Sequence, residues 1–335
     1  MKKLTILILT LFASFSVMMT GCSCSKPDNN TIRINEVARS IFYAPLYIAI
    51  NNGYMKDEGL TIEITTGNGA DKSMTALVSG SCDVGLMGPE AAIYVVAQGK
   101  KDAPKIFGQL TKRDGSFLVS RNPEPNFTWS NLENKEILGG RRGGVPAMTL
   151  EYALRQNNLI NGTNVTINYD VEFANMSGAF IGNTGDYVTL FEPSASELVK
   201  AGRGYIVASV GEMAGEVPFT AFMANESYIK SNSANLKKFL KAVMRGYNYL
   251  LTASLDDIAT ALQPHFTGSS KEIIKASIES YKNIDAWAES PIMKTSAYNR
   301  LITIMTQAGS LTSNVEFSEV VNNTLATEVM EELIA

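Results

Sequence analysis

Glycine-rich turns beside polar side chains give the clearest chemical signal in this sequence. Gly67-Asn68-Gly69 precedes a predicted helix that ends near Ser79, and Gly88-Pro89-Glu90 follows a short apolar strand predicted over 84–87. Glycines allow the backbone N–H groups of a helix N-terminus to approach a ligand closely. Loops that follow neighbouring parallel strands also face one crevice of an open α/β sheet. The segment 67–90 therefore favours one wall of a ligand-binding cleft, although an ordinary βαβ unit with packing glycines fits the same pattern.

A second strand–glycine loop–helix unit lies near the middle of the chain. Its loop, Gly139-Gly140-Arg141-Arg142-Gly143-Gly144, separates an apolar strand from a helix predicted over 147–156. The loop lacks the Lys-Ser/Thr pair of a phosphate-binding P-loop, and its glycines do not fit the dinucleotide fingerprint. Arg141 and Arg142 can fork onto an oxyanion, or they can be solvated loop charges. We expect this unit to form the opposite wall of the cleft.

Aromatic and acidic side chains near other predicted turns extend the candidate set. Adjacent Phe42 and Tyr43 follow the first predicted strand, where rings can enter the core or stack on a ligand. Asp186 and Glu192 can accept hydrogen bonds from amino groups, and Glu192 can equally cap a helix. The arginines and open helix ends favour an organic anion such as a sulfonate, whereas the rings and carboxylates favour a planar aminopyrimidine.

No catalytic constellation accompanies these residues. The sequence has no nucleophile elbow, Walker loop or HExxH motif. Asp114, next to Arg113, can simply cap its own turn. One histidine (His265) and three cysteines argue against a His/Cys metal site. We therefore expect no catalytic residue, no metal and no cofactor, and no disulfide between Cys24 and Cys82.

The N-terminal segment has the layout of a bacterial lipoprotein signal. Lys2 and Lys3 form a positive region, a mostly apolar run comes next, and Met19-Thr20-Gly21-Cys22 follows. Small residues before a cysteine resemble the bacterial lipobox, in which the cysteine is acylated. We expect a signal peptide over residues 1–21, lipidation at Cys22, and a polar tether over 22–31. A secretory signal that happens to contain a cysteine is the alternative.

Length and composition point to a folded protein of two lobes. A chain of 335 residues is too long for one average core. It is 45% apolar and 19% charged, which is typical of a globular protein and not of a multi-span membrane protein. The formal net charge is −4, and loss of Lys2 and Lys3 would make it two units more negative. This charge argues against nucleic acid or anionic lipid as a partner.

Strand and helix patterns alternate along most of the chain and predict an α/β architecture. A proline-rich polar segment at 121–131 marks a boundary, and a return crossing is predicted near Pro218. From about residue 236 the chain reads as helical, with capping boxes predicted at Ser254 and Ser269. The expected lobes are lobe 1 over 32–118 and 220–335, and lobe 2 over 119–219.

Several segments together carry a more specific pattern. They are ARSIFYAPLYIA at 38–49, NGYMKDEGL at 52–60, MTALVSG at 74–80 with DVG at 83–85, and GDY at 185–187. In combination they resemble bacterial ABC-transporter solute-binding proteins of the nitrate/sulfonate/taurine and thiamine-pyrimidine-precursor type, over nearly all of the mature chain. The resemblance implies an α/β, two-lobe type II periplasmic-binding-protein fold. Each lobe would be a mixed sheet flanked by helices, with two hinge crossings at 117–120 and 218–222.

The resemblance also implies where a ligand would be contacted. The matching loops contain the candidate ligand-binding residues Arg39, Ser40, Phe42, Tyr43, Asn68, Gly69, Asp71, Gly88, Glu90, Arg113, Asp114, Arg141, Arg142, Asp186, Tyr187, Phe191 and Glu192. A solute between the lobes would stabilise a closed state that a membrane permease and its ATPase recognise. A sulfonate- or taurine-like anion is favoured, and a thiamine pyrimidine precursor is the alternative.

The expected protein is a monomer outside the cytoplasm, anchored by lipid to the outer face of the cell membrane. A pyrimidine-synthase-like enzyme is a rival interpretation, but related enzymes use a histidine and a cysteine-rich motif. His265 instead lies in a late helical region, and no cysteine cluster exists. A sensor domain that signals through a partner is a second rival.

Overall fold

The computed structural model describes residues 30–334. The predicted signal peptide, the lipidation site Cys22, Cys24 and most of the predicted tether lie outside the described residues. Thr31, the last residue assigned to the tether, already begins strand β1 (Thr31–Glu36). Cys82 is buried and carries a free thiol. No helix within 30–334 is both long and apolar enough to cross a bilayer.

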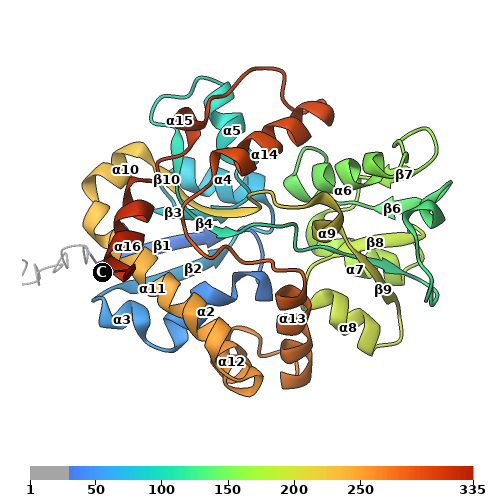
Figure 1. The fold of residues 1–335 in the computed structure, drawn as a ribbon, viewed down its shortest axis with the longest axis horizontal. Helices are drawn as coiled ribbons and strands as arrows, with labels where there is room; N and C mark the ends of the chain where they lie inside the picture. The colour runs from blue at the N-terminus through green and yellow to red at the C-terminus, as the bar shows by residue number, and fades with distance from the viewer. Residues whose placement is uncertain (1–29, 335) are drawn as a thin grey trace, which may run out of the picture.

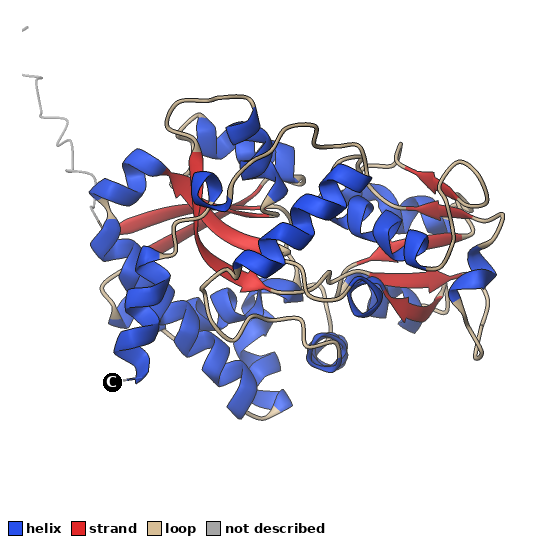
Figure 2. Cartoon of the chain, turned by 45° about the horizontal axis from the view of Figure 1, so that its top comes forward, coloured by secondary structure: helices blue, strands red, loops and turns tan. Residues whose placement is uncertain are grey.

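Two five-stranded sheets lie side by side, and helices flank the faces of each (Figures 1 and 2). The first sheet has the order β2-β1-β3-β10-β4, and we call it and its helices the first lobe. Its further strands are β2 (Thr61–Thr66), β3 (Val84–Met87), β4 (Pro104–Thr111) and β10 (Thr220–Asn225). β1 is parallel to β2 and β3, whereas β10 is antiparallel to β3 and β4. Strands β1, β2 and β3 can run parallel because helices connect each of them to the next.

The first lobe takes its early helices from these connections. They are α2 (Ala44–Asn51), α3 (Tyr54–Asp57), α4 (Ala70–Val78) and α5 (Glu90–Ala97), preceded by the 3-10 turn η1 (Ile41–Tyr43). Pro45 lies in the first turn of α2, where a missing N–H costs nothing. Gly53 has a φ of 80° and ends that helix, as the sequence predicts.

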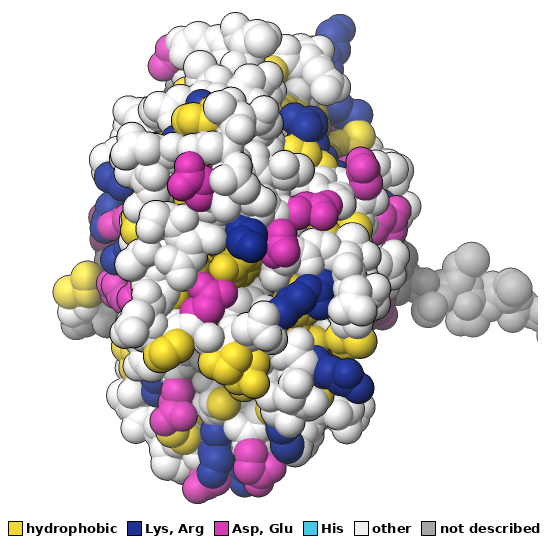
Figure 3. Space-filling view, turned by 90° about the vertical axis from the view of Figure 1, so that its right-hand side faces the viewer, with side chains coloured by type: hydrophobic (Ala, Val, Ile, Leu, Met, Phe, Trp, Pro, Cys, Tyr) yellow, Lys and Arg dark blue, Asp and Glu magenta, His cyan; other side chains and the backbone are white. Residues whose placement is uncertain are grey.

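The second sheet has the order β7-β6-β8-β5-β9, and we call it and its helices the second lobe. Its strands are β5 (Phe117–Ser120), β6 (Glu136–Leu138), β7 (Thr166–Asn168), β8 (Tyr187–Leu190) and β9 (Tyr205–Ser209). Its helices are η2 (Trp129–Leu132), α6 (Val145–Gln156), η3 (Phe173–Asn175), α7 (Met176–Ile181), α8 (Ser194–Lys200) and α9 (Val210–Ala214). β6 is parallel to β7 and β8, so this lobe repeats the architecture of the first. On the end of the second lobe, basic and acidic side chains are interspersed (Figure 3).

The chain passes between the sheets twice, but not where the first crossing was predicted. Residues 117–120 are strand β5, which pairs with β8 and β9 inside the second sheet. The sheet therefore changes earlier, over 112–116, because β4 ends at Thr111. The return passage lies between Ser209 and Thr220 and overlaps the predicted crossing at 218–222.

The rest of the chain is helical, as the sequence predicts. The helices are α10 (Glu226–Ser231), α11 (Ser233–Thr252), α12 (Leu255–Leu262), η4 (Gln263–His265), α13 (Lys271–Asn283), α14 (Thr295–Gln307), α15 (Phe317–Val320) and α16 (Thr324–Ile334). Ser254 caps α12 as predicted, because its hydroxyl accepts the Asp257 N–H. The cap of α13 is Ser270 and not the predicted Ser269, whose hydroxyl bonds to Glu197 instead. Helices α13 and α14 contact α8 and α6 of the second lobe.

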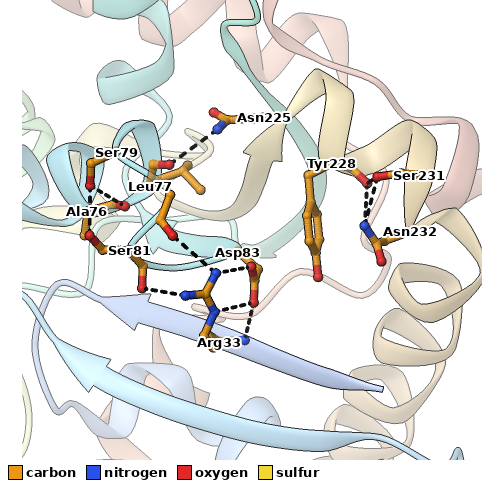
Figure 4. Close-up of polar contacts among 11 residues, drawn as sticks. Arg33, Ala76, Leu77, Ser79, Ser81, Asp83, Asn225, Tyr228, Ser231 and Asn232 are labelled. Atoms are coloured by element: carbon orange, nitrogen blue, oxygen red, sulfur yellow. Dashed lines mark hydrogen bonds and ion pairs between the residues drawn. The ribbon is translucent and has the colours of Figure 1, made fainter. Parts of the chain in front are cut away.

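Arg33 fixes the turn between α4 and β3 at the amino ends of the strands (Figure 4). Its Nη2 lies 2.7 Å from Asp83 Oδ1, and its Nε donates to Asp83 Oδ2 at 3.0 Å. The same guanidinium donates to the Gly80 carbonyl, which ends α4. A planar fork of this kind holds both ends of the turn at once.

Candidate ligand-binding site

A cavity of about 260 Å³ lies between the two lobes. Its walls come from segments that follow the parallel strands β1, β2, β3, β6, β7 and β8, together with Phe219 and Thr220 at the start of β10. This is the crevice at the carboxyl ends of strands where open α/β sheets bind ligands. The volume is slightly below the usual range of pockets for drug-sized molecules, so it suits a small solute.

Aromatic rings from both lobes form much of the cavity wall. The ring of Phe42 lies 5.7 Å from that of Phe191 and 5.8 Å from that of Phe219, measured between centroids. Phe173 lies 5.5 Å from Phe191. Tyr43, adjacent to Phe42, is also buried and lines the cavity. These rings meet edge-on or tilted and pack on one another, so together they form an apolar part of the cavity wall.

Ser40 connects the two lobes at the cavity edge. Its hydroxyl accepts the Phe42 N–H and so caps the η1 turn. The same hydroxyl donates to the Glu192 carbonyl of the second lobe at 2.7 Å. The 3-10 turn therefore holds Phe42 in place while it contacts the opposite wall.

Glu90 places a buried carboxylate against the second lobe. Its side chain is only 1% exposed, and Oε1 accepts the Val145 N–H at 3.3 Å. Val145 is the first residue of α6, so the carboxylate lies at the positive end of that helix. Burial raises the pKa of Glu90 to about 7, against the opposing effects of the Val145 N–H and Arg141. Oε2 has no hydrogen-bond partner among the described residues.

Two ion pairs join the lobes at what we call the mouth of the cavity, formed by Asp71, Lys72, Arg141 and Glu172. Arg141 Nε lies 3.5 Å from Asp71 Oδ1, and Lys72 Nζ lies 3.9 Å from Glu172 Oε2. All four side chains are about half exposed or more. Each cation at the mouth therefore already has a carboxylate from the opposite lobe.

Acidic side chains outnumber basic ones around the cavity. The acidic lining residues are Asp71, Glu90, Asp170 and Glu172, and the basic ones are Lys72 and Arg141. With four acidic and two basic side chains, the lining should repel an added anion more than it attracts one.

The structure brings ten of the predicted residues together at the cavity. They are Ser40, Phe42, Tyr43, Asn68, Gly69, Asp71, Gly88, Glu90, Arg141 and Phe191. The predicted residues that do not line it are Arg39, Arg113, Asp114, Arg142, Asp186, Tyr187 and Glu192. Each of these seven has a structural partner elsewhere.

Two of the three predicted arginines outside the cavity, Arg39 and Arg142, are held by neighbouring side chains. Arg39 Nε lies 2.9 Å from Glu36 Oε1, and its guanidinium carbon lies 5.1 Å from the ring centre of Tyr47. Arg142 stacks on Tyr169, with its guanidinium carbon 4.0 Å from the ring centre. Adjacent loop residues point in different directions, so Arg141 and Arg142 do not form the predicted fork.

The Arg113–Asp114 pair lies on the first passage between the sheets. Asp114 is fully buried, and its Oδ1 accepts hydrogen bonds from the backbone and hydroxyl of Ser116. Burial raises the pKa of Asp114 to about 7, although the Ser116 donors oppose this. Arg113 lies 3.9 Å from Asp285. The alternative role of Asp114, capping its own turn, is the one that the structure supports.

The acids and the tyrosine around β8 stabilise the second lobe itself. Asp186 accepts the Glu136 N–H at 2.9 Å, and Tyr187 donates to Glu124 at 2.7 Å. Glu192 accepts the backbone N–H of Ser196 at 2.9 Å and caps α8. The capping alternative for Glu192 is therefore confirmed.

The segment from Tyr169 to Phe173, which lines the second-lobe wall, is not among the residues predicted from the sequence. Neither Lys72 nor Phe219 is among them. The segment follows β7, a parallel strand, so the rule applied to the other loops would have identified it. Its residue types, Tyr-Asp-Val-Glu-Phe, contain no glycine and gave no separate signal.

His265 has no position at the cavity. Its ring stacks on Tyr47 at 4.4 Å between centroids, and its Nδ1 lies 2.5 Å from Arg39 Nη1. Burial and the Arg39 charge lower the pKa of His265 to about 4. Residues 30–334 contain no cluster of three His, Cys, Asp or Glu side chains that would hold a metal ion.

Comparison with known proteins agrees with this geometry. The family described as "NMT1/THI5 like" matches residues 41–253. The "Putative binding protein YtlA" of Bacillus subtilis (strain 168) is 40% identical over 320 residues, which cover 95% of this chain and 96% of the relative.

Two solved structures show the same fold. The alkanesulfonate-binding protein SsuA of Xanthomonas axonopodis pv. citri, bound to MOPS, has a TM-score of 0.70 and 16% identity, over 88% of this chain and 99% of that one. The periplasmic nitrate-binding protein NrtA of Synechocystis PCC 6803 has a TM-score of 0.73 and 18% identity, over 91% and 89%. These relatives are binding proteins, so the enzyme interpretation is set aside. The chain belongs to the NMT1/THI5-like family and has the two-lobe type II periplasmic-binding-protein fold.

Proposed function

We propose that this protein is the extracytoplasmic solute-binding component of an ABC importer, and that its ligand is a small planar heterocycle bearing an amino group. The family, the fold and the inter-lobe cavity support the first part. The lining of the cavity supports the second. A lipid on Cys22 would hold the protein at the outer face of the cell membrane, where a permease and its ATPase receive the solute.

The observation behind the ligand proposal is that the protein's own carboxylates already occupy the positions an anion would take. Glu90 lies at the N-terminus of α6, and Asp71 lies in the first turn of α4 and pairs with Arg141. An anionic ligand would have to displace or neutralise these groups. Aromatic walls and free acceptor capacity instead suit a flat ring with N–H donors.

An organic anion is the second candidate, which the adjacent arginines Arg141 and Arg142 favour at the level of sequence. Arg141 lines the cavity, with its side chain 45% exposed at the mouth. The two solved relatives are named for alkanesulfonate and nitrate. Their sequence identity to this chain is 16% and 18%, which shows a shared fold and not a shared ligand. For an anion to bind, Arg141 would exchange Asp71 for the ligand, as a surface ion pair of low strength permits.

Transport requires that the ligand change the balance between open and closed lobes. The hydrogen bonds that cross between the lobes include three near the cavity: Ser40 to the Glu192 carbonyl, Tyr94 to the Gly143 carbonyl at 2.9 Å, and Val145 to Glu90. Opening would break all three and separate the aromatic walls. A ligand that touches both walls adds to these contacts in the closed state alone, which is what the permease would recognise.

A thermal-shift panel tests the proposal. The purified mature protein would be heated with 4-aminopyrimidine and related aminopyrimidines, with methanesulfonate and taurine, and with nitrate. A ligand that binds only the folded state raises the melting temperature by an amount that grows with the logarithm of its concentration relative to Kd. We expect stabilisation by the aminopyrimidines. Stabilisation by the sulfonates or nitrate alone would select the anion candidate. A separate observation tests the sensor alternative: receptor genes next to this gene, in place of permease and ATPase genes, would favour it.

A further inference from the structure

Glu90 has one satisfied and one unsatisfied carboxylate oxygen. Oε1 accepts the Val145 N–H of the second lobe at 3.3 Å. Oε2 has no donor in hydrogen-bond geometry among the described residues, although the N–H groups of Glu90 and Ala91 at the start of α5 also act on the carboxylate. No Lys or Arg nitrogen within residues 30–334 forms an ion pair with it. A carboxylate buried in this way costs free energy unless each oxygen receives a hydrogen bond.

The backbone of Gly88 lies close to Oε2 of Glu90 and leaves no room for a side chain. A Cβ atom added at Gly88 would lie 2.0 Å from Glu90 Oε2 and 2.8 Å from the carboxylate carbon. Only glycine at this position leaves the carboxylate where it is. Gly88 and Glu90 both line the cavity, so the group lies at the ligand and not in a separate core.

We propose that Glu90 determines ligand specificity, with Oε2 accepting a hydrogen bond from an amino group of the ligand while Oε1 holds the N-terminus of α6. Gly88 is the positioning residue for this carboxylate. The inference rests on the proposed function and adds to it the chemical group that is recognised.

The arrangement links recognition to lobe closure. The two oxygens of one carboxylate contact the ligand and the second lobe, so the donor group of the ligand and the Val145 N–H are both satisfied only when the lobes are closed. A ligand that lacks the donor leaves Oε2 unpaired in the closed state. Sites with an unpaired buried polar group discriminate strongly against such analogues.

The test compares 4-aminopyrimidine with 4-methylpyrimidine, which has nearly the same shape but no amino donor. Dissociation constants would be measured by isothermal titration calorimetry on the wild-type mature protein and on three variants. In Glu90→Gln, only the amide oxygen can accept the Val145 N–H, so the amide NH₂ group replaces the acceptor Oε2. Gly88→Ala displaces the carboxylate without changing its charge. Glu124→Gln, which alters the acceptor of the Tyr187 hydroxyl outside the cavity, is the matched control.

We expect the wild type and Glu124→Gln to bind the amino compound at least tenfold more tightly than the methyl compound. Glu90→Gln and Gly88→Ala should reduce this ratio to near one, whatever their effect on stability. If the wild type binds the two compounds equally, or if both variants keep the wild-type ratio, the inference is wrong while the proposed heterocycle transport stands. Binding of methanesulfonate with neither pyrimidine would overturn the proposed ligand class itself.

Discussion

Asp71 and Arg141 face each other across the mouth of the cavity, with Oδ1 of the first 3.5 Å from Nε of the second. Both side chains are about half exposed, so the pair should contribute little to global stability. We expect Arg141→Ala to lower the free energy of unfolding by less than about 1 kcal/mol, as measured by urea denaturation.

The same variant separates the two candidate ligands. An aminopyrimidine-induced thermal shift should survive Arg141→Ala, because the proposed contacts are the rings and Glu90. If a sulfonate is the true ligand, Arg141→Ala should abolish a sulfonate-induced shift. Asp71→Ala, which frees Arg141, should then strengthen sulfonate binding and serves as the matched control.

Phe191 should contribute directly to ligand affinity, because it contacts both Phe42 and Phe173 at the cavity. Phe191→Leu keeps an apolar side chain but removes the ring face. We expect affinity for 4-aminopyrimidine to fall about tenfold, in line with roughly 0.5–1.5 kcal/mol for an aromatic contact. The measurement is calorimetric titration, with Phe127→Leu as control, since Phe127 packs on Trp129 and Tyr187 away from the cavity. Equal losses in the two variants would contradict a role for Phe191 in binding.

Glu90 should make stability depend on pH. Burial raises its pKa from 4.5 to about 7, so the folded chain binds the proton more tightly than the unfolded chain. The resulting stabilisation is complete below about pH 4.5 and is lost as the pH rises through about 7. Replacement by Gln removes this contribution. The wild type should therefore lose up to roughly 3 kcal/mol more than Glu90→Gln between about pH 5 and about pH 8.

Urea denaturation at the two pH values gives this difference directly. Asp114, whose pKa is also raised to about 7, shifts stability in the same direction and remains in both proteins. It therefore cancels in the comparison. Identical pH profiles for the wild type and Glu90→Gln would show that Glu90 does not titrate as its burial requires.

Gly246 should be essential for the packing of α11 on α2. A Cβ at this position would lie 2.1 Å from the carbonyl oxygen of Pro45. We expect Gly246→Ala to cost about 1–3 kcal/mol, because the two helices would have to separate. Gly178, in helix α7, has open space around it, so Gly178→Ala should be neutral or stabilising by up to about 1 kcal/mol. Thermal denaturation of both variants checks the contrast, and equal stability would contradict the close packing.

Cys22 should anchor the protein to the membrane. Cys22→Ala removes the thiol that would be acylated, so the protein should move from the membrane fraction to the soluble fraction. Cys24→Ala, two residues away, should leave the distribution unchanged. Immunoblots of fractionated cells give the result, and membrane retention of the Cys22 variant would contradict the lipidation hypothesis.

The order of the elements and the segments that surround the cavity can be predicted from the sequence alone. Strand alternation, Pro45 at a helix start and the glycine turns at 67–69 and 139–144 depend on local backbone preferences. The walls follow from a topological rule, because loops after parallel strands lie at one edge of a sheet. For this reason the sequence predicts Asn68, Gly88 and Phe191 at the cavity, and all three line it.

Which polar groups remain available to a ligand depends on contacts between segments that are distant in the sequence. Arg142 pairs with Tyr169 and Glu192 caps α8, whereas one oxygen of Glu90 stays open beside Gly88. Residue type states how many hydrogen bonds or charges a side chain can offer, but distant segments decide which of them are already used. The ligand chemistry therefore depends on contacts between lobes, since Val145 lies 55 residues from Glu90 along the chain.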